Sequence, residues 1–412
     1  MRTLYTLENP VQRYAWGSTR WIPQLLGLNP KDDLPWAELW MGAHPKAPSR
    51  ISGKTGTSSL AAAIEEDPQG MLGSMVARKG SDLPFLFKLL AAAQPLSIQA
   101  HPSIAQAKEG WERENALSIP LDSPERNYKD QNHKPEILCA LTPFRAMCGF
   151  RTKPEILALL EVLEAPGILS LQNLLAGRDE AQGLELFLRG LFGMGQGERA
   201  ALTEHIRSRV PRLRRDLPSY DAEWTLLDQF AEAYPGDPGI IAPLYLNVLD
   251  LDPGQAVFLP SGVLHAYVSG FGIELMANSD NVLRGGLTPK HVDVEELIRV
   301  LGFQAFRPNI LSPAFPPDES RSTDAPTPKG LCSYPPCCEE FALALYRNSE
   351  PAFLEQGLPY IIITTEGSVE IRSGKDEICR LDKGQSVFVS ASASSVSLHG
   401  VGTAYIAGVG RA

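Results

Sequence analysis

Residues 252–262 have the sequence DPGQAVFLPSG, and residues 382–392 have the sequence DKGQSVFVSAS. The two stretches share D-x-G-Q-x-V-F, and each joins a glycine turn to an apolar run typical of a β-strand. A repeated turn and strand predicts two related β barrels or sandwiches, of the jelly-roll kind that many short antiparallel strands form. His265 follows the first copy, whereas the equivalent position after the second is Ser395. We therefore expect the second unit to be structural.

A helical pattern interrupts the first β region. In TKPEILALLEVLE (152–164), Thr152 and Glu155 have the spacing of a capping box, and apolar residues then recur at helical spacing. Segments 182–194, 198–209 and 222–234 continue this way. The sequence therefore predicts a mainly β protein with an α-helical insert.

These patterns divide the chain into four parts. We expect a discontinuous catalytic β domain (1–150 and 236–309), a helical insert domain (151–235), a Pro/Ser/Asp-rich linker (310–330) and a C-terminal β domain without a metal (331–412).

Composition limits the class of protein. The chain has 412 residues, 43% of them hydrophobic, and a formal net charge of -10, so its average field repels nucleic acid and acidic membrane surfaces. The N-terminus has no apolar core of signal-peptide length, and no run of about 18 apolar residues occurs. We expect a soluble, cytoplasmic protein whose anionic ligands must meet a local basic cluster.

Three strands carry residues that suit a metal. In LSIQAHP (96–102) strand alternation places Gln99 and His101 on one face, and in PSGVLHAYV His265 belongs to the polar face. Together with Glu136 they form a mixed nitrogen and oxygen set suited to zinc. The alternative for each taken alone is a polar strand face or a satisfied histidine.

The stretch DQNHKPEIL (130–138) adds a lysine to this set. Pro135 biases Lys134 toward extended geometry, which puts Lys134 and Glu136 on one face and His133 on the other. If that face points inward, the pair is a metal ligand and a base; at the surface it is a plain ion pair.

Three cations are candidates for the local basic cluster. Arg284 is followed by Gly285 and Gly286, which let the backbone approach a ligand closely, and Lys290 lies nearby. Lys88 sits inside PFLFKLL, where an unpaired lysine is costly to bury, although an edge lysine reaching solvent is the alternative.

These residues lie within motifs that resemble one family, the type I mannose-6-phosphate isomerases of the cupin superfamily. The resemblance rests on YAWGS (14–18), AELWMGAHPKAPS (37–49), LPFLFKLLAAAQPLSIQAHP (83–102), YKDQNHKPEILCAL (128–141) and ELMANSDNVLRGGLTPKHVDV (274–294). It implies two cupin-type jelly-roll domains plus a helical domain, and one zinc per chain held by Gln99, His101, Glu136 and His265.

The resemblance also implies an activity and its residues. The implied reaction interconverts mannose 6-phosphate and fructose 6-phosphate through a cis-enediol, in a protein that we expect to be a monomer with a sugar phosphate as its partner. Arg284 matches the active-site arginine and is expected to stabilise the enediolate. Phosphate contacts match Lys88, Ser97 and Lys290. We expect Lys134 to be the base because it shares a face with Glu136, with Glu274 and His133 as rivals.

Two other functions remain open at this level. His101, His265 and Glu136 could form the iron site of a cupin oxygenase, against which Gln99 and the basic residues count; dependence on oxygen would decide. A sugar-phosphate sensor would keep the pocket without a base, and replacing Lys134 or Arg284 would then change affinity only.

Overall fold

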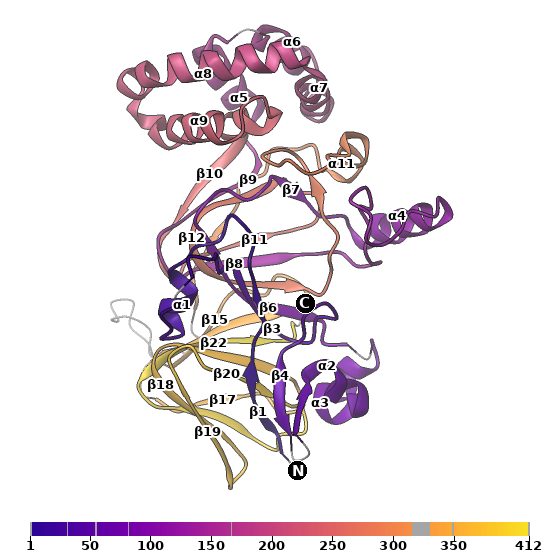
Figure 1. Cartoon of the computed structure of the whole chain (residues 1–412), viewed down its shortest axis with the longest axis vertical. Helices are drawn as coiled ribbons and strands as arrows, with labels where there is room; N and C mark the ends of the chain where they lie inside the picture. Colours follow the sequence, from indigo (N-terminus) through magenta and orange to yellow (C-terminus); the bar gives the residue numbers. More distant parts are fainter. Residues whose placement is uncertain are drawn as a thin grey trace.

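The structure is a computed structural model that describes residues 2–30, 32–53, 56–80, 82–165, 167–314, 330–347 and 350–410. Most of its strands belong to two large antiparallel sheets, and most of its longer helices gather at one end of the molecule (Figure 1). The predicted mainly β protein with a helical segment is confirmed at this level.

The first sheet lies in the middle of the molecule, between the helices and the second sheet (Figure 1). Its main strand order is β14-β11-β8-β12-β6-β3-β2, and β12 lies next to β6, β7, β8 and β9. The strands are β2 (Val11–Gln12), β3 (Glu38–Met41), β6 (Phe85–Ala92), β7 (Gln99–Ala100), β8 (Glu136–Ala140), β9 (Phe144–Phe150), β10 (Leu246–Leu251), β11 (Ala256–Leu259), β12 (His265–Ala277), β13 (Leu283–Arg284) and β14 (Ile310–Leu311).

The second sheet combines the C-terminal strands with strands from the start of the chain. Its members are β1 (Leu4–Glu8), β4 (Arg50–Gly53), β5 (Gly56–Ser59), β15 (Gly330–Ser333), β16 (Ala342–Arg347), β17 (Ala352–Leu354), β18 (Tyr360–Ser373), β19 (Glu377–Asp382), β20 (Ser386–Val389), β21 (Val396–His399) and β22 (Gly402–Gly408). Because β1 pairs with both β20 and β4, this sheet extends across the predicted division of the chain. The domain boundaries stay a prediction.

The helices after β9 follow the predicted pattern. They are α5 (Lys153–Leu163), α6 (Ile168–Ala176), α7 (Glu180–Gly193), α8 (Gln196–Asp216), α9 (Asp221–Ala233) and the short α10 (Ala242–Tyr245). The capping box of Thr152 and Glu155 begins α5. Its residues Ile156, Leu159 and Leu160 are buried. Among the helices that the structure describes, none is long and apolar enough to cross a bilayer.

Helices also occur within the regions predicted to be mainly β. They are α1 (Trp21–Leu25), α2 (Leu60–Glu66), α3 (Pro68–Ala77), α4 (Ile104–Ala116) and, after β13, α11 (Val294–Val300). The sequence analysis did not identify α4, which is polar and buries only Ala107, Gly110 and Glu114. Its capping box, Ser103 with Gln106, is the local signal that identifies it.

The predicted linker is partly strand. Ile310 and Leu311 form β14 and pair with β11, and Ala314 bridges to Ser333. Residues 315–329 of the predicted linker lie outside the described residues.

The repeated sequence has the same local structure in both sheets. The Asp252 N–H donates to Gln255 Oε1 at 2.9 Å, and the Asp382 N–H donates to Gln385 Oε1 at the same distance. Gly254 and Gly384 both have positive φ, 90° and 85°. The strands that follow, β11 and β20, cover equivalent positions of the repeat. The repeat therefore holds in structure as well as in sequence.

Each sheet buries an apolar face against the other. Phe87, Leu89 and Ile273 of the first sheet belong to one cluster with Ile361 and Phe388 of the second. Part of the first sheet also meets the helices, through Leu264 and Ala266. Alternation along the strands directs Lys88 of β6, Glu136 of β8 and Glu274 of β12 away from this apolar cluster, toward the polar site.

Candidate metal centre and active site

The strand β12 brings the predicted ligands together. His265, its first residue, is the cross-strand partner of Gln99 on β7, and Gln99 is in turn the partner of Arg284 on β13. Ile98 and Ala100 pack in the apolar cluster that contains the helices, as does Ala266. Gln99 and His265 therefore lie on the opposite face, as strand alternation predicts.

Three of the four predicted ligands form a compact group. His101, Glu136 and His265 each offer one ligand atom, and these atoms lie within 4.8 Å of one another. His101 Nε2 is 3.3 Å from Glu136 Oε1, and His265 Nε2 is 3.6 Å from Glu136 Oε2. Ligand atoms around a tetrahedral zinc lie about 3.3 Å apart, since each is roughly 2.0–2.1 Å from the metal. The spacing therefore fits a small divalent ion.

Both imidazoles present the same nitrogen to the centre. His101 Nδ1 is 2.6 Å from the carbonyl oxygen of Asn281, and His265 Nδ1 is 3.0 Å from that of Val263. A carbonyl oxygen can only accept, so each Nδ1 carries the hydrogen and each Nε2 keeps its lone pair. This arrangement of a backbone acceptor behind the ring is typical of metal-binding histidines.

The ligand atoms of the three residues lack hydrogen-bond partners among the described residues. His101 Nε2, Glu136 Oε1 and His265 Nε2 are buried and have no hydrogen bond among the described residues. Buried polar atoms without partners are costly, and a metal ion satisfies all three at once. The residues therefore fit zinc, with Gln99 beside His265 as the predicted fourth ligand.

The local charges favour the ligand forms of these groups. Burial, together with the Lys134 cation, lowers the pKa of His101 to about 4, so its ring is neutral near pH 7. Burial alone would raise the pKa of Glu136, but the Lys134 cation together with His101 and His265 outweighs it and holds that pKa well below its usual value. Glu136 is thus ionised and His101 unprotonated, which is what metal binding requires.

Lys134 lies beside the centre, on the face predicted for it. Its Nζ is 2.9 Å from Glu136 Oε1, an ion pair by distance that lacks hydrogen-bond geometry. The side chain is 10% exposed and that of Glu136 is 1% exposed. The amine is therefore held at the edge of the buried site.

A second cluster of charges lies next to the metal ligands. Lys88 on β6 is 2.7 Å from Glu274 Oε2 on β12 and 3.7 Å from Glu38 Oε1 on β3, and all three side chains are buried. Burial would lower the pKa of Lys88, but Glu274 and Glu38 outweigh it and raise that pKa. Burial raises the pKa of Glu274, and Glu136 and Glu38 add to this against Lys88. The pKa of Lys88 and that of Glu274 are both raised because a single ammonium is shared between the Glu274 and Glu38 carboxylates.

The sequence analysis missed two members of this cluster. Glu38 accepts a hydrogen bond from the Trp40 indole at 2.7 Å, and the Tyr267 hydroxyl donates to Glu136 Oε2 at 3.3 Å. Each had a local signal: Glu38 interrupts the apolar AELWM, and Tyr267 shares the polar face of its strand with His265.

Arg284 and Lys290 lie on one side of the centre. Arg284 is in register with Gln99, and burial lowers its pKa without removing its charge. Lys290 is exposed; partial burial and the Arg284 cation lower its pKa. Ser97 is two positions before Gln99, on the same face of that segment by alternation.

His133 contacts a different part of the molecule. Its Nε2 is 2.6 Å from Glu340 Oε1, in the segment that leads to β16, and both side chains are about a quarter exposed. The structure thus separates His133 from its neighbour Lys134, as the alternation predicts.

Comparison with known proteins gives a consistent result. Residues 4–153 match the family model described as phosphomannose isomerase type I, catalytic domain. The chain is 40% identical over 399 residues to mannose-6-phosphate isomerase from Escherichia coli (strain K12), covering 96% of this chain and 97% of that protein.

Solved structures of two proteins are similar to this structure over the whole chain. A mutant of phosphomannose isomerase from Salmonella typhimurium has a TM-score of 0.89 and 36% identity, with 100% of each chain covered. A zinc-bound structure of mannose 6-phosphate isomerase has a TM-score of 0.87 and 36% identity over the same coverage.

Proposed function

Because this chain belongs to the family of type I mannose-6-phosphate isomerases, we propose that it is a zinc-dependent enzyme that interconverts mannose 6-phosphate and fructose 6-phosphate. The observation that carries the proposal is the buried group of His101, Glu136 and His265, whose ligand atoms face one another without hydrogen-bond partners among the described residues. We propose Gln99 as the fourth ligand because its strand partner is His265.

The reaction needs a base and a stabilised oxyanion. After ring opening, a proton leaves carbon 2 of the aldose and returns to carbon 1, while the hydroxyl proton passes from one oxygen of the cis-enediol to the other. Zinc held by Gln99, His101, Glu136 and His265 would act as a Lewis acid toward the two sugar oxygens. The protein must supply the rest.

Lys134 is our choice for the base, and it would take the proton from carbon 2 as a free amine, after its ammonium has lost a proton to water at the edge of the site. Its amine lies next to the metal ligands, 2.9 Å from Glu136, at the boundary between buried site and solvent. Glu274 shares a short contact with Lys88, which occupies one of its oxygens. His133 is paired with Glu340. Of the three candidates, Lys134 is therefore the one least engaged elsewhere and closest to the centre.

Arg284 would stabilise the enediolate. It is in line with Gln99 and His265 across three strands, and its partly buried guanidinium faces less screening by water than a surface arginine. Gly286, with φ of 118°, lets the backbone next to Arg284 pass close to Gly239.

The phosphate contacts divide into two groups. Lys290 and Ser97 belong to the side of the centre that Arg284 occupies, and we propose that they bind the phosphate. Lys88 is held between Glu274 and Glu38, so a phosphate would have to displace a carboxylate to reach it. We propose that Lys88 sets the charge of Glu274 and orients it toward the sugar.

The fold-level details remain proposals of the same kind. We propose that the two sheets form cupin-type jelly rolls, with catalytic (1–150 and 236–309), helical (151–235) and C-terminal (331–412) domains, and that the enzyme is a monomer with one zinc. The matched turns at Asp252 and Asp382 support the relation between the two sheets.

A coupled assay tests the function. Fructose 6-phosphate formed from mannose 6-phosphate is followed with metal-free protein, and again after zinc is added back. We expect turnover only with zinc, and none in Glu136→Ala. Turnover that depends on oxygen would favour the oxygenase, and sugar-phosphate binding without turnover under any divalent metal would favour the sensor.

A further inference from the structure

Asn281 is a fully buried amide that joins two parts of the candidate site. Its side chain is 0% exposed, on the segment between β12 and β13. Oδ1 accepts from the N–H groups of Lys129 and Asp130, at 2.7 and 3.2 Å. Nδ2 donates to the carbonyl oxygens of Asp130 and Asn132, at 2.9 and 2.8 Å, and to Asp130 Oδ1 at 3.2 Å. One side chain thus holds the loop backbone at Lys129, Asp130 and Asn132.

The same residue supports a predicted metal ligand through its backbone. Its carbonyl oxygen accepts from His101 Nδ1 at 2.6 Å, which leaves Nε2 directed at Glu136. The position of this carbonyl depends on where the side chain anchors the segment, because both belong to one residue.

The loop held by Asn281 leads directly to the proposed base. The Asn132 carbonyl belongs to the peptide bond of His133, and Lys134 follows. Neighbours reinforce the attachment: Ser279 Oγ donates to Asp130 Oδ1 at 2.9 Å, and the Asp280 N–H donates to Asp130 Oδ2 at 2.8 Å. Segments 129–132 and 279–281 are therefore fastened to each other just before Lys134.

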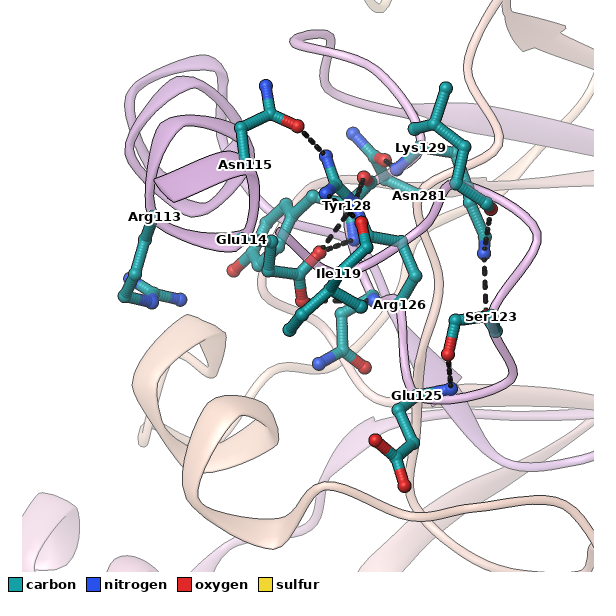
Figure 2. Close-up of polar contacts among 12 residues, drawn as sticks. Arg113, Glu114, Asn115, Ile119, Ser123, Glu125, Arg126, Tyr128, Lys129 and Asn281 are labelled. Carbon is teal, nitrogen blue, oxygen red and sulfur yellow. Dashed lines mark hydrogen bonds and ion pairs between the residues drawn. The ribbon is translucent and has the colours of Figure 1, made fainter. Parts of the chain in front are cut away.

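Helix α4 holds the preceding part of the loop. Glu114 accepts from the N–H groups of Asn127 and Tyr128, at 3.0 and 2.9 Å. Arg126 donates to the carbonyl oxygen of Tyr128 and lies 2.9 Å from Glu114 Oε2. Figure 2 shows these groups with Asn281 at the Lys129 end of the same segment. The loop is anchored by α4 on one side and Asn281 on the other.

We propose that Asn281 is a positioning residue that couples the zinc ligand His101 to the base Lys134. The proposal rests on the proposed function. Through its side chain Asn281 sets the path of the loop that delivers Lys134, and through its carbonyl it sets the ring orientation of His101. A displacement of the loop would therefore move the Asn281 carbonyl and the His101 ring, and the reverse also holds. Asn281 is fully buried, so its side chain and its backbone cannot shift independently of their close-packed surroundings.

The chemistry of the amide explains why asparagine is present. The site requires acceptors for two N–H groups and donors for two carbonyl oxygens and a carboxylate. Among the side chains, only a primary amide supplies two donor hydrogens and an oxygen with two lone pairs in one planar group. Aspartate would keep the acceptors but lose the donors, and would bring a second carboxylate to 3.2 Å from Asp130 Oδ1.

The test compares Asn281→Ala and Asn281→Asp with Asn278→Ala in the zinc-loaded enzyme. Asn278 is the matched control because it lies in the same segment and its amide makes one long contact, 3.5 Å to the Leu83 carbonyl. The measurements are kcat, KM, the zinc Kd by chelator competition, and deuterium exchange at Lys129 and Asp130.

For Asn281→Ala we expect kcat to fall about 100-fold with KM within about threefold, since misplacement of a catalytic group acts on the chemical step. We expect the zinc Kd to rise about tenfold, as for loss of an outer-shell contact, and exchange at Lys129 to accelerate. Asn281→Asp should show losses at least as large as those of Asn281→Ala, because its carboxylate would face Asp130 and two carbonyl oxygens. Asn278→Ala should match the wild type in all four measurements.

Wild-type kcat and zinc Kd in Asn281→Ala, even with a lower Tm, would overturn the proposal and leave a purely structural amide. If Asn281→Ala does not fold, the same criterion applies to Asn281→Asp, which keeps the two acceptors. A wild-type protein without isomerase turnover would instead overturn the proposed function, and the zinc Kd and exchange measurements would still test the coupling to His101.

Discussion

The same kind of turn precedes β11 in the first sheet and β20 in the second, but the two sheets differ in the side chains that their strands bury. In the first sheet the row of cross-strand partners that starts at Val257 runs through Leu138, Glu274, Lys88 and Trp40. It places a buried ion pair at the centre of the sheet, 2.7 Å between the charged atoms.

In the second sheet the equivalent row starts at Val387, which matches Val257 in the sequence repeat, and runs through Ile362, Ile406 and Ala344. Ile362 and Ile406 belong to an apolar cluster and are at most 2% exposed. A backbone of the same kind thus supports either a charged pocket or an apolar core. The lesson is that the turn and strand repeat encodes the scaffold, whereas the side chains on one face decide whether it has chemistry.

The largest expected effect comes from removing a metal ligand of the first sheet. We expect His265→Ala to raise the zinc Kd by at least about 100-fold and to abolish turnover, because it leaves Glu136 and His101 with an incomplete site. Ser395→His, at the position that matches His265 in the repeat, should bind no zinc beyond the one held by the first sheet. Metal content after dialysis measures both, and a second zinc per chain in Ser395→His would contradict the distinction between the sheets.

The next largest effect concerns the buried lysine. Lys88→Met leaves Glu274 and Glu38 buried without their cation, which should lower the free energy of unfolding by about 3–5 kcal/mol. Since burial already raises the pKa of Glu274, the loss should shrink as pH falls and the Glu274 carboxyl becomes neutral.

Urea denaturation at pH 7 and pH 5 measures this loss. The control is Lys79→Met, because Lys79 lies 2.9 Å from Glu339 but the two side chains are 70% and 62% exposed. It should leave stability close to that of the wild type, because water screens an exposed ion pair. Equal losses of stability in Lys88→Met and Lys79→Met would mean that burial does not determine how much an ion pair contributes to stability.

A cavity in the second sheet should affect stability and leave the chemistry intact. Ile362→Ala removes a side chain that is 0% exposed, at an expected cost of about 3 kcal/mol. We expect kcat per folded molecule and the zinc Kd to stay at wild-type values, because Ile362 packs in the apolar cluster of the second sheet. A fall in kcat under conditions where the variant is fully folded would show that the second sheet takes part in the site.

The smallest effect concerns the attachment of β1 to the second sheet. Glu377 accepts hydrogen bonds from the N–H groups of Thr3 and Leu4 and from the Thr3 hydroxyl. Burial alone would raise its pKa, but these bonds outweigh it and lower the pKa. A carboxyl whose folded pKa is lowered stabilises the fold above its unfolded pKa, about 4.3, and loses that contribution as pH falls below it.

Glu377→Gln should therefore cost about 1 kcal/mol at pH 7, an effect limited by solvent at this half-buried site, and progressively less toward pH 3. The difference in Tm between the two proteins at pH 7, 5 and 3 measures it. A difference that stays constant with pH would contradict the assignment to the ionised carboxylate.

Much of the site could be predicted because strand alternation is a local rule. Gln99 and His101 on one face, His265 opposite Leu264 and Ala266, and Lys134 beside Glu136 each follow from a few neighbouring residues. The helices from α5 onward were predictable for the same reason, since periodicity and the Thr152 capping box are local.

Other features could not be predicted because they depend on pairing between distant segments. The burial of Glu38 beside Lys88 requires β3 to pair with β6, and the pairing of β1 with β20 joins residues 4–6 to residues 387–389. Helix α4 was missed because it is mostly polar and only its cap is diagnostic.

The sequence by itself determined which side chains share a face of each strand, and it predicted Gln99, His101, Glu136 and His265 as ligands. Only the tertiary structure decided that the two histidines and Glu136 meet within 4.8 Å, that Lys88 lies between two carboxylates, and that Asn281 reaches both His101 and the loop before Lys134. The physical reason is range: alternation and capping act between near neighbours in the chain, whereas strand pairing and burial join segments that are far apart in it, and they alone determine distances and the environment of each charge.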